Sequence, residues 1–238
     1  LGIGDGTDVV VYDDSQSLFA SRVWWSLRAY GLASVRVLDG GFGAWTRAQL
    51  PVTRDAGPPP KSEWTGRREE RTLATWREVH AAISRPDAVI LDARTDGEFY
   101  GTTVRARRGG AIPGAVHVEW TRNLTPEGEF KPAAELKQMY EDAGVTPDRE
   151  VITYCQGGYR AAHSYLALRL LGYGKKAAVA VENVTFDPPR VAIGEKVSMQ
   201  FTLRSTSARS QELLIDVAVH FVQARGTSAK VFKLERVS

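Results

Sequence analysis

Hydrophobic positions divide the chain into a long region of alternating strand and helix patterns and a shorter region of strand patterns alone. In residues 1–174, short β-branched runs typical of buried parallel strands alternate with segments whose apolar residues recur at three- and four-residue steps. The runs predict strands over residues 9–12, 35–38, 89–91 and 151–154. The spacing predicts helices over residues 18–30, 44–49, 133–143 and 159–171, and one that begins at a Thr75–Glu78 capping box. The alternation predicts an α/β fold with a parallel sheet flanked by helices.

After residue 174 apolar and polar residues alternate singly, as in 197–205 and 213–221. Period-two alternation with no helix between the runs predicts an antiparallel arrangement, here a partial β-sandwich module over residues 175–238. This module carries 10 Lys and Arg against 6 Asp and Glu, whereas residues 1–174 carry 21 against 22. Such a basic excess is usually a solvated surface, so we do not expect nucleic acid as the main partner. Binding of nucleic acid through residues 175–238 stays an alternative.

An internal repeat links two parts of the α/β region. Val11-Tyr12-Asp13 corresponds to Thr153-Tyr154-Cys155, and Arg28-Ala29-Tyr30-Gly31 corresponds to Arg169-Leu170-Leu171-Gly172. The first copy is partial and the second nearly complete. A Gly-Pro-Pro-Pro stretch and a charged segment separate them. We therefore expect a partial first copy at 1–55, a linker at 56–72, a catalytic domain at 73–174 and the β module at 175–238.

Composition narrows the class of protein. The chain has 238 residues, of which 43% are hydrophobic and 25% charged, and no apolar run approaches the ~18 residues of a membrane span. A single cysteine excludes an internal disulfide framework and fits a reducing compartment, which predicts a cytoplasmic protein with no membrane contact. The four histidines show no metal-ligand spacing, so we expect no metal and no cofactor.

The candidate chemistry lies in the segment Cys155-Gln156-Gly157-Gly158-Tyr159-Arg160, between a buried strand and the start of a helix. Backbone N–H groups of such a turn, with the helix dipole behind them, converge on a negative charge at the centre. The two glycines let the backbone bend around the sulfur, and Arg160 adds a charge that can pair an anionic substrate. This environment stabilises a thiolate or a persulfide anion on Cys155. His163, one turn into the helix, is better explained as a solvent- or core-facing histidine than as a base for Cys155.

These motifs resemble a tandem-domain rhodanese of the thiosulfate/3-mercaptopyruvate sulfurtransferase family. The resemblance covers roughly residues 1–174. It rests on Asp92-Ala93-Arg94 with Glu98-Phe99 and Gly101, on Gly110 through Ala115, on Tyr154 through Arg160, and on Val11 through Asp14, Arg22 through Trp25 and Asp39-Gly40-Gly41. It implies a rhodanese-type sheet in one partial and one near-complete copy. It also implies an enzyme that moves sulfane sulfur from thiosulfate or a mercapto-acid to cyanide or a thiol. A phosphatase relative with a longer loop is disfavoured by the six residues from Cys155 to Arg160.

Carried over by motif, the resemblance assigns Cys155 as the nucleophile. Binding of the substrate and the persulfide is assigned to Gln156, Gly157, Gly158, Tyr159, Arg160 and Arg94. Supporting positions are Asp92, which with Arg94 would organise the facing loop, Glu98, and Leu18 and Phe19 in the wall from the non-catalytic half. Asp13 stands in that half where the cysteine would be, and Glu98 stands where thiosulfate-specific members often place a second arginine.

Three further expectations concern the rest of the chain. The catalytic copy lacks the strand that its repeat partner has at 35–38, so we expect the N-terminal fragment to dock its strand and Trp45 region against the open sheet. The β module resembles the immunoglobulin-like segment that follows some HEAT-repeat DNA alkylation-repair proteins, over 197–205, 213–222 and 230–234. The alternative to a sulfurtransferase is a catalytically impaired fusion in which this basic module binds nucleic acid or protein. The oligomeric state stays open.

Overall fold

The computed structural model describes residues 2–55, 57–59, 61–68, 72–174, 179–187, 198–205, 213–223 and 226–237. The chain divides into two compact units, Leu1–Gly174 and Lys175–Ser238. The first unit contains both copies of the repeat. Each unit is described below by itself.

The partial copy forms a short strand–helix–strand–helix unit. Strands β1 (Val9–Val11) and β2 (Val35–Val37) pair in parallel and are connected by helix α1 (Leu18–Ala29). Helix α2 (Gly41–Arg47) follows β2. Trp24 of α1 is buried and its indole N–H donates to the carbonyl of Val35 at 3.1 Å, which fixes the helix on the strand pair. Helix α2 begins three residues before the predicted 44–49 segment. Its start is set by Gly41, where a Cβ would lie 2.2 Å from the carbonyl oxygen of Asp13.

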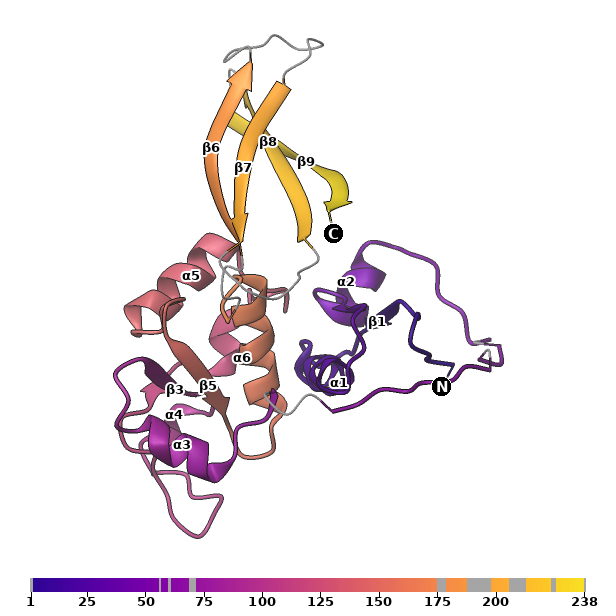
Figure 1. Cartoon of the computed structure of the whole chain (residues 1–238). Helices are drawn as coiled ribbons and strands as arrows, with labels where there is room; N and C mark the ends of the chain where they lie inside the picture. Colours follow the sequence, from indigo (N-terminus) through magenta and orange to yellow (C-terminus); the bar gives the residue numbers. More distant parts are fainter. Residues whose placement is uncertain are drawn as a thin grey trace. The chain divides into compact units, whose positions relative to one another are not determined.

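The catalytic copy is a three-stranded parallel sheet in the order β4-β3-β5. Strands β3 (Ala88–Asp92) and β5 (Glu150–Tyr154) run side by side in Figure 1, and β4 (Val116–His117) lies on the other edge of β3. Along the chain these elements alternate with α3 (Trp76–Ala82), α4 (Asp96–Phe99), η2 (Trp120–Asn123), α5 (Ala133–Asp142) and α6 (Tyr159–Leu170). The predicted strands and helices of this region are therefore present, and α4 and η2 are additions that the hydrophobic pattern did not reveal.

Strand β3 shows how the sheet builds two cores. Val89 and Leu91 point to one face and join Tyr140 and Leu168 of α5 and α6, whereas Ala88 and Ile90 point to the other face and join α3. This follows from the period of two along a strand. All five residues of β3 are buried because helices cover both faces. The capping box predicted at Thr75 and Glu78 is present and starts α3.

The two copies pack through helices rather than through strands. Trp24 and Leu27 of α1, with Val35 of β2, form one buried cluster with Leu166 of α6. Strands β1 and β2 pair with each other and form a sheet separate from β4-β3-β5. The N-terminal fragment therefore docks on the catalytic copy, but the prediction that its strand would dock on the open sheet edge is wrong. The three-residue strands offer little backbone to pair, whereas α1 offers a continuous apolar stripe.

The predicted linker runs without helix or strand through its described residues 57–59, 61–68 and 72 apart from a single 3₁₀-type residue at 72. Part of it contacts the partial copy. Thr65 donates its backbone N–H and its hydroxyl to the Asp5 carboxylate at 3.0 and 2.6 Å, and Trp64 meets the Tyr30 ring edge-on.

The second unit consists of antiparallel pairs among its described residues. Strand β6 (Val179–Asp187) pairs with β7 (Ser198–Ser205), and β8 (Leu213–Gln223) pairs with β9 (Gly226–Val237). The predicted antiparallel runs are present, with Val197 outside the described residues, and β6 is a strand that the alternation did not identify. Face-to-face packing of the two pairs into a sandwich stays a prediction.

The turn between β1 and α1 is organised by one carboxylate. Asp13 Oδ1 accepts the backbone N–H groups of Ser15 and Ser17 at 2.9 and 2.8 Å, and Oδ2 accepts those of Phe19 and Ala20, both at 2.8 Å. Ser17 caps the helix in the left-handed region at φ 62°. Four N–H groups that would otherwise lack acceptors at a helix start are thus satisfied by one side chain.

We predict that Asp13→Ala lowers the free energy of unfolding by about 2–4 kcal/mol, because charge-assisted hydrogen bonds are lost and N–H donors are left unsatisfied. Urea unfolding followed by circular dichroism measures this. Asp14→Ala is the matched control: this exposed neighbour bonds only the Ser15 hydroxyl at 3.2 Å, so its change should stay within about 0.5 kcal/mol. Equal effects of the two substitutions would contradict the role given to Asp13.

Candidate active site

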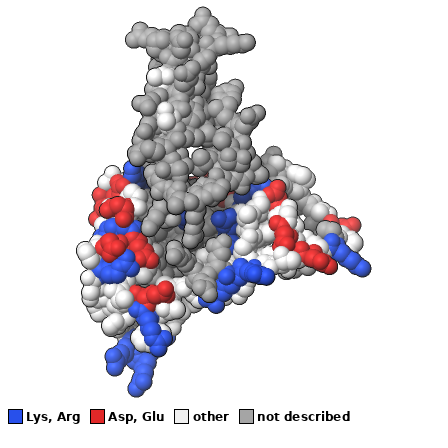
Figure 2. Space-filling view, in the orientation of Figure 1, with Lys and Arg blue, Asp and Glu red and all other residues white. Residues whose placement is uncertain are grey.

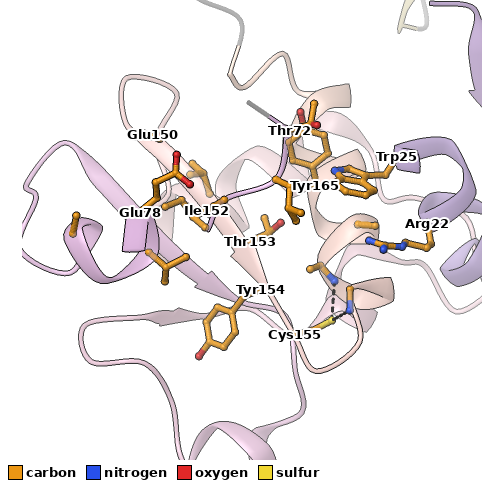
Figure 3. A pocket seen from close by; sticks show the side chains of 18 of the residues that line it. Arg22, Trp25, Thr72, Glu78, Glu150, Ile152, Thr153, Tyr154, Cys155 and Tyr165 are labelled. Atoms are coloured by element: carbon orange, nitrogen blue, oxygen red, sulfur yellow. Dashed lines mark hydrogen bonds between the residues drawn. The ribbon is translucent and has the colours of Figure 1, made fainter. Parts of the chain in front are cut away.

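The single cysteine lies where β5 ends and α6 begins. Cys155 follows Tyr154, the last residue of β5, and is partly exposed. Its Sγ accepts the backbone N–H of Gly158 at 3.1 Å and that of Ala161 at 3.4 Å, the two bonds dashed in Figure 3. The sulfur therefore sits at the positive end of α6, as the sequence predicts, and a negative charge on it is stabilised by these donors and by the helix dipole.

The two glycines of the turn differ in how strictly they are needed. Gly158 has φ 85°, a left-handed conformation that other residues rarely adopt. A Cβ on Gly158 would also lie 2.9 Å from Nη1 of Arg22. A Cβ on Gly157 would only meet the Tyr159 ring at 3.4 Å, so the bend around the sulfur depends mainly on Gly158.

The Cys155 turn and the Asp13 turn are two versions of one structure. Asp13 occupies the position of Cys155, and both helices begin at a left-handed residue, Ser17 at φ 62° and Gly158 at φ 85°. In the first turn the two carboxylate oxygens take four N–H groups. In the second, Sγ takes two, and within the described residues the N–H groups of Gly157, Tyr159 and Arg160 have no acceptor. The Cys155 turn can accommodate a second anionic atom beside the sulfur.

Arg160 is bound to a buried carboxylate. Its Nη1 and Nη2 donate to the two oxygens of Glu98 at 2.5 and 3.0 Å, and Glu98 is only 1% exposed. Glu98 also completes the capping box that starts α4 at Thr95. The Arg160 guanidinium, with help from Thr95, lowers the pKa of Glu98 to about 2. The pKa of Arg160 is raised, chiefly by its hydrogen bonds to Glu98 and to a smaller extent by the neighbouring Cys155 side chain. Arg160 thus lies beside the sulfur with most of its charge already compensated.

Arg94 is bound in the same way by Asp92. Arg94 Nε donates to Asp92 at 2.9 and 3.0 Å, Nη2 donates to Asp92 at 2.5 Å, and Nη2 also reaches the Gly110 carbonyl at 2.9 Å. Tyr154 donates to Asp92 and accepts the Ile112 N–H at 3.2 Å. Asp92 and Arg94 hold the 110–112 loop, as the motif predicts for the facing loop. No contact among the described residues brings Arg94 to Cys155, so its predicted part in persulfide binding stays a prediction.

The remaining predicted residues lie around the turn. Gln156 donates to the Arg105 carbonyl at 3.5 Å, and Tyr159 meets Phe19 edge-on at 5.4 Å between ring centroids. Phe19, from α1, thereby connects the partial copy to the Cys155 turn. Leu18 is the first residue of α1 and is partly buried, with no contact to the turn among those described.

His163 points into the core and not toward the thiol. It is fully buried, stacks on Phe130 at 4.7 Å, meets Trp120 edge-on at 5.1 Å, and lies 3.3 Å from the side-chain nitrogen of Asn123. Burial lowers its pKa to about 4, so the ring is neutral at physiological pH. Among the described residues, no group of three His, Cys, Asp or Glu is arranged to hold a metal ion, and no helix there is long and apolar enough to cross a membrane.

A cavity of about 610 Å³ opens at Cys155 and extends along β5, the edge strand of the catalytic sheet. Figure 3 shows Cys155 and Arg22 on one side of it and Glu78 and Glu150 on the other. Sequence reasoning did not assign its lining residues Arg22, Trp25 and Tyr165, because their meeting depends on how α1 packs on α6. Figure 2 shows acidic and basic side chains next to one another at several places on the visible face of the first unit, and basic side chains alone at its lower tip.

Comparison with known proteins agrees with this geometry. A model of the rhodanese-like domain matches residues 2–48 and 75–182, and a model described as the C-terminal immunoglobulin-like domain of the uncharacterised protein YhaZ matches residues 180–238. The chain is 34% identical over 173 residues to a thiosulfate sulfurtransferase of Pseudomonas aeruginosa and 34% identical over 177 residues to a 3-mercaptopyruvate sulfurtransferase of Mus musculus. These alignments cover 73% and 72% of this chain, and 64% and 60% of the relatives.

Among solved structures, the 3-mercaptopyruvate sulfurtransferase SseA of Escherichia coli superimposes with a TM-score of 0.65 at 34% identity, over 73% of this chain and 65% of that one. The chain thus spans somewhat less than two thirds of the length of these relatives. It belongs to the rhodanese-like family, is related to the thiosulfate and 3-mercaptopyruvate sulfurtransferases, and ends in a YhaZ-type immunoglobulin-like domain.

Proposed function

We propose that the chain is a sulfurtransferase that moves sulfane sulfur from thiosulfate or 3-mercaptopyruvate to cyanide or a thiol through a persulfide on Cys155. The observation that carries the proposal is the position of Sγ at the start of α6, where it accepts two backbone N–H groups. Further N–H groups of the same turn have no acceptor among the described residues. Both the thiolate and the longer Cys–S–S⁻ anion fit such a turn.

The reaction is a double displacement. The Cys155 thiolate attacks the transferable sulfur of the donor, which is the outer sulfur of thiosulfate or the thiol sulfur of 3-mercaptopyruvate, and a persulfide forms on Cys155. With thiosulfate the sulfur–sulfur bond breaks and sulfite leaves with the electron pair. With 3-mercaptopyruvate the carbon–sulfur bond breaks, and the enolate of pyruvate leaves and takes up a proton. Cyanide or a thiolate then attacks the outer sulfur, and Cys155 departs as the thiolate.

The turn must hold its shape through both displacements, and Glu98 supports this. Its bidentate bond to Arg160 ties the first turn of α6 to α4, and its bond to Thr95 ties α4 to the end of β3. The reduced thiol that the reaction requires is consistent with a cytoplasmic location. The alternative, a catalytically impaired fusion, is less well supported, because the turn between β5 and α6 directs backbone N–H groups at Cys155 Sγ.

We predict that thiosulfate or 3-mercaptopyruvate raises the intact mass of the protein by one sulfur atom and that cyanide reverses the gain, with thiocyanate as the product. Mass spectrometry before and after cyanide measures this. Because Cys155 is the only cysteine, Cys155→Ser should show no gain. A wild-type chain that takes no sulfur from either donor, or a Cys155→Ser chain that does, would overturn the proposed function.

We predict that Glu98→Gln lowers the free energy of unfolding by about 2–4 kcal/mol at pH 7, because it leaves Arg160 without its buried partner. The folded-state pKa of Glu98, about 2, lies below its ordinary value of 4.5, so the stabilisation is present above pH 4.5 and is lost as pH falls toward 2. The difference between wild type and variant should therefore shrink by about 1.4 kcal/mol per pH unit below that value.

Urea unfolding between pH 7 and pH 3 measures the effect. The control is Glu129→Gln, which removes a carboxylate from a pair with Arg47 whose side chains are 46% and 49% exposed. That substitution should cost no more than about 1 kcal/mol at any pH. A Glu98→Gln effect that does not change with pH would show that the pair contributes through packing and not through charge.

A further inference from the structure

An anionic sulfur donor is favoured by a cation near Cys155, and the two arginines that the motifs assign to the site, Arg160 and Arg94, are already paired with buried carboxylates. Arg160 is bound at both terminal guanidinium nitrogens by Glu98, and Arg94 is bound by Asp92. Arg105 lies 3.8 Å from Glu98 and does not line the cavity. The charges of Arg160 and Arg94 each face a carboxylate that is no more than 1% exposed, so little of either charge is left for a ligand.

The charged side chains at the far side of the cavity are also paired. Arg85 donates to Asp87 at 3.0 and 2.7 Å and to Glu150 at 2.7 Å. Glu78 accepts from Thr75 at the start of α3. Among the described residues lining the cavity, Arg22 is the arginine whose guanidinium has neither an ion pair nor a hydrogen bond.

Arg22 is held in place against the persulfide turn. It is partly buried on α1, and its Cζ lies 4.6 Å from the centroid of the Trp25 ring, a cation–π contact that orients the side chain. Its Nη1, Cζ and Nη2 lie 2.9, 3.4 and 3.8 Å from the position of a Cβ on Gly158. Gly158 also donates its N–H to Cys155 Sγ, so the guanidinium and the thiol flank the same residue. Figure 3 shows the nitrogen atoms of Arg22 directed from α1 toward this turn.

We propose that Arg22, contributed by the copy that lacks the cysteine, binds the oxyanion of the sulfur donor while Cys155 attacks the donor's transferable sulfur. This inference rests on the proposed function and names the substrate class for it: small donors with a carboxylate or a sulfur oxyanion close to the transferable sulfur. A planar guanidinium matches such groups through two parallel hydrogen bonds. Because no carboxylate among the described residues forms an ion pair with Arg22, its charge is available to the ligand.

The first test does not depend on sulfur transfer. Iodoacetate and iodoacetamide both alkylate a thiolate with loss of iodide, and they differ mainly in that iodoacetate carries a carboxylate. Because Cys155 is the only cysteine, the alkylation rate reports on this site alone. We expect Arg22→Gln to lower the ratio of the iodoacetate rate to the iodoacetamide rate by about 10-fold or more. The ratio for Arg22→Lys should lie between those of wild type and Arg22→Gln. Dividing by the iodoacetamide rate removes any change in the thiolate itself.

Arg28→Gln is the matched control, since it removes the same charge from the same helix at an exposed position whose guanidinium bonds only the Ala33 carbonyl. Its ratio should equal that of wild type. In steady state, Arg22→Gln should raise KM for thiosulfate and for 3-mercaptopyruvate about 10- to 100-fold with a smaller change in kcat. A ratio and a KM that match those of Arg28→Gln would overturn the assignment of Arg22. Failure of the wild type to take up sulfur would overturn the proposed function instead, and the alkylation ratio would still decide whether Arg22 binds an anion.

Discussion

The first unit is organised by the need to satisfy N–H groups that converge where a parallel strand turns into a helix. The chain meets this need twice, with different acceptors. At Asp13 a carboxylate takes four N–H groups at 2.8–2.9 Å and the turn is permanently filled. At Cys155 a single sulfur takes two, and its neighbours remain available. The same backbone geometry is therefore closed by a carboxylate in one copy, whereas in the other it surrounds the thiol and leaves N–H groups that the proposed persulfide would use.

Buried carboxylates give the catalytic copy its rigidity. Asp92 and Glu98 each engage an arginine side chain and also fix backbone: Asp92 bonds the Arg94 N–H, and Glu98 caps α4. Removing such charges from water is costly unless they are paired and fully hydrogen-bonded, and here both conditions hold. This pairing also has a chemical consequence. Arg160 and Arg94, which the motifs assign to the substrate, instead bind Glu98 and Asp92 and hold loops together, so their charges are less available to a ligand.

The sequence was sufficient to predict what depends on local pattern. The strands around Cys155, the capping box at Thr75 and the helix that follows Gly158 all arise from short stretches whose residues specify their own conformation. It was less informative where a side chain's role depends on its partner. Arg160 looked like a free cation in the motif, and only the fold brings Glu98, 62 positions earlier, into contact with both terminal guanidinium nitrogens. The two copies dock as the sequence predicts, but the predicted mode of docking was wrong for the same reason: a strand-sized gap suggested strand pairing, whereas the stripe of Trp24 and Leu27 on α1 packs on α6.

This packing explains why a copy without a cysteine is still part of the site. With Leu166 of α6 buried against Trp24, α1 lies along the catalytic helix, and its outward residues Phe19 and Arg22 reach the persulfide turn. Glu98 balances the positive charge of Arg160 within the catalytic copy. If the donor is an anion, the cation that balances its charge therefore has to come from another element. Arg22 is on the one helix that both borders the cavity and belongs to the other copy. Under the proposed function, this arrangement separates two tasks: the backbone N–H groups at the start of α6 would hold the sulfur, and Arg22 of the partial copy would supply the charge that selects the molecule delivering it.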